Sequence, residues 1–292
     1  MSHALPQGVY TALVTPITRT GEVDYDTFRA LIDWQSQHGV QGVVVGGTTG
    51  EGTSLSVDER ERAIATVREH ADALKVIAGT GCANLPETIR LSRFAQREGC
   101  DAVLVLPPFY YKPVSEGGLI AYFMRLLDSV DVPTLLYNYP DLAGVSITPA
   151  VVEGLLDYPY LWGLKDSSGE WGTLLAFLLH LPRLQVFVGA ESLLADGLAG
   201  GAAGCISGLA NALPELLIAL DLAVRRKGNA TALSERLAGV LEVVDSMPFI
   251  PAIKRICEWR GLPKMWVRPP LCDLTAQQAD VLLGRLRSLE VL

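Results

Sequence analysis

The chain has 292 residues, of which 49% are hydrophobic and 19% are charged, and its formal net charge at pH 7 is −8. This acidic balance argues against a nucleic-acid-binding or anionic-membrane-binding surface, because such a surface needs a basic face. No apolar stretch reaches the roughly 18 residues of a membrane span, and "MSHALPQGVY" at the N-terminus lacks the basic and apolar regions of a secretory signal.

Eight short apolar segments, rich in Val, Leu and Ile, predict eight β-strands. Each segment is mostly continuous rather than alternating and closes in Gly, Pro, Thr or another polar residue, which is typical of parallel strands covered on both faces. The segments are residues 11–16, 42–51, 75–81, 102–111, 134–140, 161–169, 184–192 and 203–211.

Helical patterns separate these segments. Residues 24–38 place apolar side chains on one face, and residues 56–74 open with Ser56 and Glu59 as a capping box. Further helices are expected at residues 84–98, 115–130, 148–157, 171–181, 192–199 and 214–226.

Strand and helix alternate eight times, which predicts an α/β fold of the (β/α)8 TIM barrel type. The alternative, an open doubly wound sheet, usually has G-x-G-x-x-G after its first strand, whereas this chain has "ITRTGEVD" there. We expect residues 1–227 to form the barrel and residues 228–292 to form a C-terminal helical extension packed on it. In the extension, "IPAIKRICEWRGLP" (250–263) and "LTAQQADVLLGRLRSLEVL" (274–292) each predict a helix, and the chain is expected to stay helical to its end. The basic residues between 254 and 260 are interpreted as a solvated helix face.

The cysteines and histidines argue against a disulfide or metal framework. The five cysteines are widely spaced and never form CxxC, which favours buried free thiols in a reducing cytoplasm. No histidine falls at a predicted strand end. Glu51, Asp166 and Glu191 alone would give a metal ion few ligands, so we expect no catalytic metal. The histidines, at the N-terminus or on predicted helices, are His3, His38, His70 and His180.

Lys165 is the only lysine at a predicted strand end, and the active sites of (β/α)8 barrels lie at that end of the strands. One interpretation is structural, an ion pair with Asp166 or Glu191. The other is an amine nucleophile that condenses with a carbonyl group, for which a dry barrel mouth favours the uncharged, reactive form. Tyr137 ends the preceding strand, about 4.8 Å away, and is either a general acid and base or a core tyrosine.

The motif "GGTTGE" (46–51) follows the second predicted strand. Its glycines free backbone N–H groups and its two threonines add hydroxyl donors, which suits a carboxylate or a phosphate. A tight turn into the next helix is the structural alternative.

Four motifs together resemble the dihydrodipicolinate synthase / N-acetylneuraminate lyase family. They are "GTTGE" (47–51), "PPFYYKP" (107–113), "YNYP" (137–140) and "GLKDSSG" (163–169). The segments "GVYTALVTP", "VFVGAES" and "PFIPAIKRICEWRGLP" fit other parts of the family pattern, so the likeness spans essentially the whole chain. The family consists of Schiff-base (class I) lyases and aldolases that act on pyruvate or other 2-oxo acids.

The resemblance implies a role for each matching residue. Lys165 would form the imine with the 2-oxo carbon, and Tyr137 would shuttle protons above it. Thr49 would hold the substrate carboxylate together with backbone amides of its loop. Thr48 and Tyr110 would complete a hydroxyl relay, with the tyrosine reaching across from a neighbouring subunit. The substrate-binding residues that complete the implied site are Gly47, Gly189, Glu191, Ile206 (through its carbonyl) and Ser207.

Several positions depart from the known subfamilies. Members that make dihydrodipicolinate carry arginine two residues after the proline of "YNYP", where this chain has Leu142. Sialic-acid lyases carry an acidic pair after the glycine of the seventh strand and a serine after the eighth, whereas this chain has Glu191-Ser192 and Gly208. The wording "YNYP" is similar to that of members that cleave 2-keto-3-deoxy sugar acids, but those usually have a different residue at Glu51.

We therefore expect a pyruvate-dependent Schiff-base lyase that reversibly cleaves a 2-oxo-3-deoxy acid to pyruvate and an aldehyde without any cofactor. The resemblance implies a homo-oligomer, a dimer or a tetramer, in the cytoplasm, and neither nucleic acid nor a membrane is an expected partner. Two alternatives share the imine: 4-hydroxy-tetrahydrodipicolinate synthesis from pyruvate and aspartate semialdehyde, despite Leu142, and a dehydratase or deaminase reaction. Two others do not need it: a phosphate-binding barrel using the glycine-rich "LAGGAAGCISG" (198–208), and a non-catalytic 2-oxo-acid binder.

Overall fold

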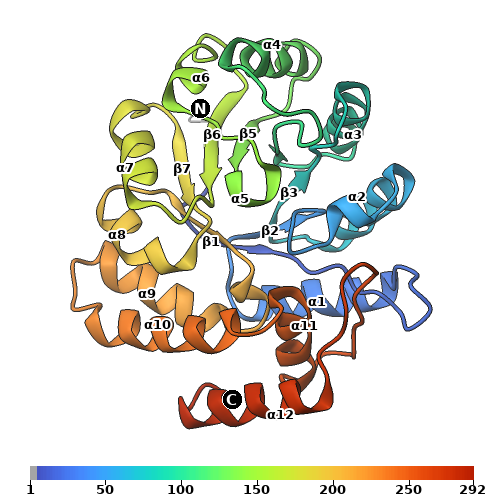
Figure 1. Ribbon diagram of the computed structural model, residues 1–292, viewed down its shortest axis with the longest axis vertical. Coiled ribbons are helices and arrows are strands. Elements are labelled where there is room, and N and C mark those ends of the chain that lie inside the picture. The colour runs from blue at the N-terminus through green and yellow to red at the C-terminus, as the bar shows by residue number, and fades with distance from the viewer. Residues whose placement is uncertain (1–4) are drawn as a thin grey trace.

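The computed structural model describes residues 5–292 (Figure 1). His3 and the first residues of the N-terminal segment, where no secretory signal is expected, lie outside the described residues.

Eight parallel strands form a closed barrel in which each strand pairs with its neighbours in chain order and β8 pairs back onto β1. Helices surround the barrel (Figure 1), which confirms the predicted (β/α)8 fold. The strands are β1 (Gly8–Ala12), β2 (Gly42–Val45), β3 (Lys75–Gly79), β4 (Ala102–Val105), β5 (Thr134–Asn138), β6 (Leu161–Asp166), β7 (Gln185–Val188) and β8 (Gly204–Ser207).

Five helices of the barrel begin after a residue whose side chain accepts one of their free N–H groups. Asp24, Ser56, Asn84, Ser115 and Thr148 each accept a backbone N–H from the first turn of the helix that follows, as N-cap residues do. The helices are α1 (Tyr25–Gln37), α2 (Val57–His70), α3 (Leu85–Arg97), α4 (Glu116–Leu127), α5 (Pro140–Ala143), α6 (Pro149–Glu153), α7 (Trp171–His180), α8 (Leu194–Ala199) and α9 (Pro214–Arg225). Short 3₁₀ turns lie at η1 (Gly52–Ser54), η2 (Glu191–Leu193) and η3 (Leu209–Asn211).

The first strand differs from its predicted position, residues 11–16, because glycine allows it to begin earlier. Gly8 pairs with Gly204 of β8, and both have positive φ, 136° and 157°. A Cβ at Gly204 would lie 1.9 Å from the carbonyl oxygen of Gly8, so no other residue fits this approach. The sequence pattern missed the strand start because glycine usually indicates a break rather than a buried strand.

Two apolar cores hold the barrel together. The larger fills the layer between the strands and the surrounding helices, and the smaller fills the barrel interior. In the interior, the ring of Tyr10 meets the ring of Phe187 edge to face, with centroids 5.5 Å apart, a favourable aromatic geometry. This aromatic pair belongs to the core that fills the barrel interior.

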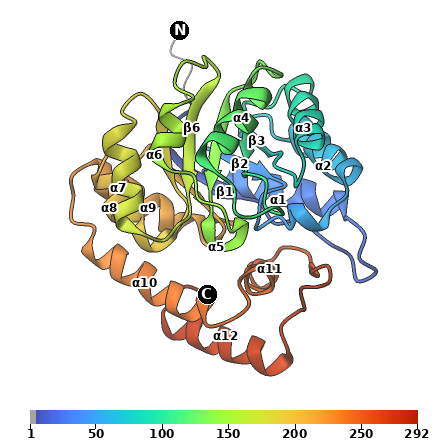
Figure 2. The same ribbon diagram turned by 45° about the horizontal axis from the view of Figure 1, so that its top comes forward.

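Three further helices follow the eighth β/α unit: α10 (Thr231–Asp245), α11 (Phe249–Trp259) and α12 (Ala276–Ser288). They gather below the barrel in the view of Figure 2. The expectation of a chain that stays helical to its end is wrong for residues 260–275, which are not helical. There Trp266 forms an isolated antiparallel bridge with Ile17, so tertiary pairing sets the path of this segment.

Two side-chain predictions are also wrong. Lys254 is 1% exposed and therefore does not belong to a solvated face, although Arg255 on the same helix and Arg260 just after it are partly exposed. The prediction of buried thiols fails at Cys272, which is exposed in the non-helical segment, and holds for Cys82, Cys100, Cys205 and Cys257. Within residues 5–292, no helix combines the length and the apolarity needed to cross a bilayer.

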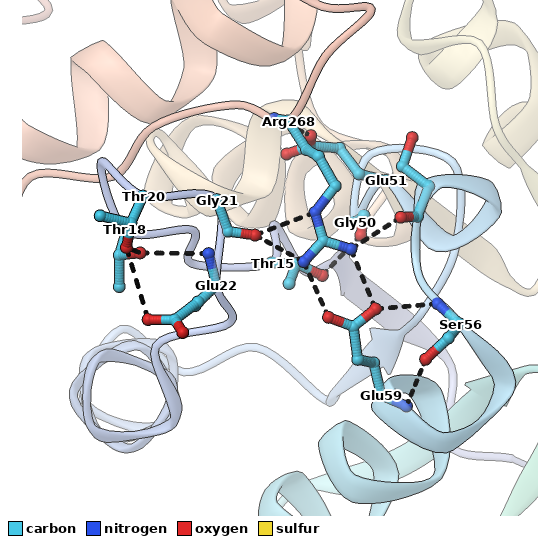
Figure 3. Close-up of polar contacts among 11 residues, drawn as sticks. Thr15, Thr18, Thr20, Gly21, Glu22, Gly50, Glu51, Ser56, Glu59 and Arg268 are labelled. Carbon is cyan, nitrogen blue, oxygen red and sulfur yellow. Dashed lines mark hydrogen bonds and ion pairs between the residues drawn. The ribbon is translucent and has the colours of Figure 1, made fainter.

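Arg268 attaches the non-helical segment to the barrel (Figure 3). Its guanidinium donates to both carboxylate oxygens of Glu59, at 2.8 and 2.9 Å, and to the carbonyl oxygen of Gly21. Glu59 also closes the predicted capping box with Ser56 at the start of α2. The bidentate contact with Arg268 lowers the pKa of Glu59 from 4.5 to about 2.

This pKa shift predicts how the stability of the protein depends on pH. A carboxyl group whose pKa is lowered on folding contributes stability above its unfolded pKa, and this contribution is lost as the pH falls toward its folded pKa. We therefore expect Glu59→Gln to lower the free energy of unfolding by about 1–3 kcal/mol near pH 6, as charged hydrogen bonds do. The difference from the parent should shrink as the pH falls from about 4.5 toward 2.

Urea unfolding at pH 6, 4 and 3 measures this difference. Glu69→Gln is the matched control, because Glu69 lies on the same helix with a side chain that is 74% exposed, and it should change stability by less than about 0.5 kcal/mol. A Glu59→Gln effect that stays constant over this pH range would contradict the assignment.

Candidate active site

Lys165 lies on β6 at the mouth of the barrel and is 5% exposed. It stands in register with Tyr137 of β5 and Phe187 of β7. Its Nζ lies 3.3 Å from the Tyr137 hydroxyl and 4.5 Å from the centre of that ring. No carboxylate of residues 5–292 lies within ion-pair distance of this amine. The structural alternative, an ion pair with Asp166 or Glu191, is therefore wrong.

The two carboxylates that the alternative required have other partners. Asp166 accepts hydrogen bonds from the Asn138 side chain at 2.7 Å and from Ser168 at 2.8 Å. Its burial raises the pKa of this carboxyl group. Glu191 accepts from Ser207 Oγ at 2.6 Å and from the backbone N–H of Leu209 at 3.3 Å.

Gly189, after β7, makes room for the lysine. A Cβ at this position would lie 2.6 Å from Lys165 Cε and 2.0 Å from Ser167 Oγ. Any side chain at Gly189 would therefore displace the amine.

A line of polar groups runs from the lysine to the loop after β2. The Tyr137 hydroxyl lies 3.3 Å from Lys165 Nζ on one side and 3.4 Å from Thr48 Oγ1 on the other. Both distances are long for hydrogen bonds, as is common in active sites without substrate. The phenol is thus placed to exchange a proton with a group held on Lys165.

The "GGTTGE" loop forms a closed turn, and its two threonines line the cavity that contains Lys165. Its turn is closed by bonds from Glu51 N–H to the Thr48 carbonyl and from Gly52 N–H to the Gly47 carbonyl, at 2.9 and 3.0 Å. The N–H groups of Thr48 and Thr49 donate to no acceptor in the described part of the chain. These amides and the two hydroxyls are available to bind an anion.

Two cavities meet at Thr48, Tyr137 and Leu142. The larger, about 430 Å³, contains Lys165, Thr49 and Gly189. The smaller, about 260 Å³, is mostly apolar. Residues Leu241, Asp245, Phe249 and Ile250 of α10 and α11 line the larger cavity, so the C-terminal extension forms one wall of the site.

The larger cavity is acidic away from the lysine. Glu191 and Asp245 line it, and Lys165 is the only basic residue among its described lining. Asp245 lies at the exposed rim, where partial burial and then repulsion from Glu191 raise the pKa of its carboxyl group. Ser167 lies deeper, with a buried hydroxyl that has no hydrogen-bond partner among residues 5–292. The wall opposite the loop thus offers acceptors and a hydroxyl, without a second positive charge.

Most of the expected site residues come together in this cavity, and four lie elsewhere. Gly47 lines the smaller cavity. Ser207 is fully buried, and its hydroxyl donates a hydrogen bond to the Glu191 carboxylate. Ile206 is fully buried in the barrel interior. Tyr110 is 73% exposed, next to Tyr111, and lines neither cavity.

Sequence reasoning missed Ser167, Asp245 and Phe249. A signal existed for Ser167, because side chains two residues apart in a strand share a face and Ser167 comes two residues after Lys165. No local signal existed for Asp245 or Phe249, because only the docking of α10 and α11 brings them to the barrel mouth.

Comparison with known proteins agrees with this geometry. Residues 5–287 match the model of the dihydrodipicolinate synthetase family. The chain is 41% identical to an uncharacterized DapA-like lyase of Chloroflexus aurantiacus, over 96% of this chain and 95% of that protein. It is 38% identical to the 4-hydroxy-tetrahydrodipicolinate synthase of Cereibacter sphaeroides, over 92% and 93%.

A solved structure is similar over the same extent. YagE, a prophage protein of the dihydrodipicolinic acid synthase family from E. coli K12, was solved in complex with pyruvate. It superposes with a TM-score of 0.93 at 32% identity and covers 99% of this chain and 100% of its own.

The motifs, the fold and these comparisons agree over nearly the whole chain. They confirm the predicted fold, the lyase class and pyruvate-dependent Schiff-base chemistry, and the chain belongs to the dihydrodipicolinate synthetase family.

Proposed function

We propose that the protein reversibly cleaves a 2-oxo-3-deoxy acid into pyruvate and a neutral, hydroxyl-bearing aldehyde. The observation that carries the proposal is the placement of Lys165: a buried amine without a carboxylate partner, 3.3 Å from the Tyr137 hydroxyl. An amine in such surroundings serves as a nucleophile toward a carbonyl carbon.

The reaction begins at Lys165. Its neutral Nζ attacks the 2-oxo carbon of the substrate, and the carbonyl oxygen leaves as water to give a protonated imine. This imine withdraws electrons from C3, so that the C3–C4 bond can break and leave an enamine on the lysine. Protonation of the enamine at C3 and hydrolysis of the imine then release pyruvate and restore the amine. The proposed cycle needs neither a metal nor an organic cofactor.

Tyr137 moves the proton that bond cleavage requires. As the C3–C4 bond breaks, the C4 hydroxyl must lose its proton to become the aldehyde, and the phenol oxygen lies where it can accept this proton. Thr48, 3.4 Å from the phenol, passes protons to and from Tyr137. General acid–base catalysis of this kind contributes about 10²–10⁴-fold in rate.

The loop after β2 binds the substrate carboxylate. Thr48 and Thr49, whose N–H groups have no acceptor among the described residues, line the same cavity as Lys165. A carboxylate held there places the adjacent 2-oxo carbon over the lysine. Gly189 keeps the opposite side open for this carbon skeleton.

The charges of the larger cavity support a neutral aldehyde. Glu191 and Asp245 can accept hydrogen bonds from hydroxyl groups, and the unpartnered Ser167 hydroxyl can donate or accept one. A second carboxylate on the aldehyde would face these two acids without a cation to pair with. Leu142, 61% exposed, offers no charge at the position where the family's dihydrodipicolinate-forming members carry arginine.

The second candidate is 4-hydroxy-tetrahydrodipicolinate synthesis, in which pyruvate condenses with aspartate semialdehyde. It is favoured by the names of relatives that are 33–38% identical to this chain. The lining of the cavity argues against it, because aspartate semialdehyde carries a carboxylate that would lie against Glu191 and Asp245.

We further propose a cytoplasmic homo-oligomer, a dimer or tetramer, in which Tyr110 completes the hydroxyl relay of a neighbouring subunit. Tyr110 and Tyr111 are 73% and 78% exposed, and side chains of this size are enriched where subunits meet. The four buried free thiols support a reducing compartment.

Borohydride reduction in the presence of pyruvate tests the role of Lys165. We expect mass spectrometry to find a reduced adduct on Lys165 and on no other lysine, and we expect Lys165→Ala to abolish both the adduct and turnover. Tyr137→Phe should keep the adduct and lose about 10²–10⁴-fold in kcat. Lys112→Ala is the matched control, since this lysine lies in an exposed loop, and it should behave like the parent. A parent protein that takes no label would overturn the proposal.

The charge of the aldehyde subsite predicts substrate preference. We expect kcat/KM for condensation of pyruvate with glyceraldehyde to exceed that with aspartate semialdehyde by at least about tenfold, equivalent to ~1.4 kcal/mol. Glu191→Gln combined with Asp245→Asn should reduce this preference about tenfold, because both negative charges are removed while the hydrogen-bond acceptors remain.

Steady-state rates with both aldehydes measure the preference. Glu242→Gln, on the same helix as Asp245 but paired with Arg285 at the surface, should leave it unchanged. A parent enzyme that prefers aspartate semialdehyde would favour the second candidate instead.

A further inference from the structure

Glu51, the last residue of the "GGTTGE" loop, is buried together with a lysine from the C-terminal extension. The side chains of Glu51 and Lys254 are 0% and 1% exposed, and they form an ion pair. They are 203 residues apart in the chain. The other carboxylate oxygen of Glu51 accepts the backbone N–H of Arg268 at 2.9 Å.

Every partner of the Glu51 carboxylate therefore comes from the extension. Lys254 lies on α11, and its ammonium also donates to the carbonyl oxygen of Trp266 at 2.6 Å. The Arg268 guanidinium reaches from the same segment to Ser54, just after the loop, and to Gly21 and Glu59 (Figure 3). The extension thus contacts both the loop and the segments next to it.

A buried ion pair is a poor way to gain stability. Removing two charges from water offsets much of their attraction, and apolar pairs of similar size often do as well. Burial lowers the pKa of Lys254, and the nearby Glu51 carboxylate opposes that change. Such pairs are best explained by a geometric requirement, because each charge can lie in only one place.

The loop itself shows this requirement. Glu51 has φ of 53°, in the left-handed region, which is unfavourable for a residue other than glycine. A Cβ at Gly52 would lie 2.1 Å from the Gly46 carbonyl oxygen, so the turn is tightly closed. The Glu51 N–H bonds to the carbonyl of Thr48, which links the position of the ion pair directly to the two threonines of the site.

We propose that Glu51 and Lys254 are positioning residues that hold Thr48 and Thr49 in register with Tyr137 and Lys165. The inference rests on the function proposed above for the two threonines. It makes the C-terminal extension part of the catalytic apparatus, since α11 sets the loop that binds the carboxylate. Neither Glu51 nor Lys254 touches substrate; both act through the backbone of residues 48–51.

Lys254→Met tests the proposal, because methionine keeps the length of the side chain and removes its charge. This single variant leaves the Glu51 carboxylate buried without the Lys254 ammonium, so it could fail to fold. The double variant Glu51→Gln/Lys254→Met leaves no unpaired buried charge, so its kinetics report on function in a folded protein. Arg255→Met is the matched control, since Arg255 is the next residue of α11 and pairs with Glu258 at the surface. Its kinetic constants should equal those of the parent.

The kinetic readout distinguishes positioning from general damage. We expect the folded double variant to raise KM for pyruvate and lower kcat, with a loss of at least about tenfold in kcat/KM, because ångström-scale misplacement of binding groups has effects of this size. KM for the aldehyde should change less than about twofold, since the aldehyde binds on the opposite wall. A folded double variant with kcat and KM for pyruvate within twofold of the parent overturns the proposal.

Hydrogen exchange gives a second readout that needs no turnover. Amides of residues 46–54 should exchange at least about tenfold faster in the double variant than in the parent, while those of α3 and α4 stay unchanged. Unchanged exchange in residues 46–54 also overturns the inference. If the parent protein fails to form the pyruvate adduct, the proposed function fails, but this exchange result still decides whether the pair positions the loop.

Discussion

A lysine that is buried without a carboxylate partner is the constraint around which the rest of the site is built. Burial of an amine is unfavourable unless its surroundings accept it, and here they are a phenol, an aromatic ring face and the gap left by Gly189. The nearby acids are engaged elsewhere, Asp166 with Asn138 and Ser168, and Glu191 with Ser207. The barrel therefore keeps its single strand-end amine available for chemistry.

Within one cavity, the groups proposed for the chemistry and the groups proposed for aldehyde recognition lie on different walls. One wall, from β2 and β5, carries Thr48, Thr49 and Tyr137, which we propose bind the carboxylate and transfer protons, and we propose that Glu51 and Lys254 position its loop. The other wall, from β7 and α10, carries acids and no cation besides Lys165 among its described residues. In the proposed reaction, bond cleavage and the choice of aldehyde thus depend on different elements of the fold.

Local patterns predicted a large part of this arrangement. Continuous apolar segments, the apolar face of residues 24–38 and the capping box of Ser56 and Glu59 located strands and helices, because burial and helix termini leave direct marks on the sequence. They failed where glycine let backbones approach closely, as at Gly8 and Gly204, and where tertiary pairing replaced helix, as in residues 260–275. They also failed at Lys254, whose burial depends on a carboxylate 203 residues away.

By itself the sequence determined the barrel and the family, and it singled out Lys165 and Tyr137 as the residues proposed for the reaction, because strand ends in a (β/α)8 barrel converge on one face. Only the tertiary structure decided that the lysine has no ion-pair partner, that Ser167 and Asp245 face the substrate cavity, and that Lys254 is buried against Glu51. The physical reason is that the charge state and partners of a side chain depend on what surrounds it in space. For Asp245 and Lys254 this depends on the docking of α10 and α11, which lie far from the barrel loops in the chain.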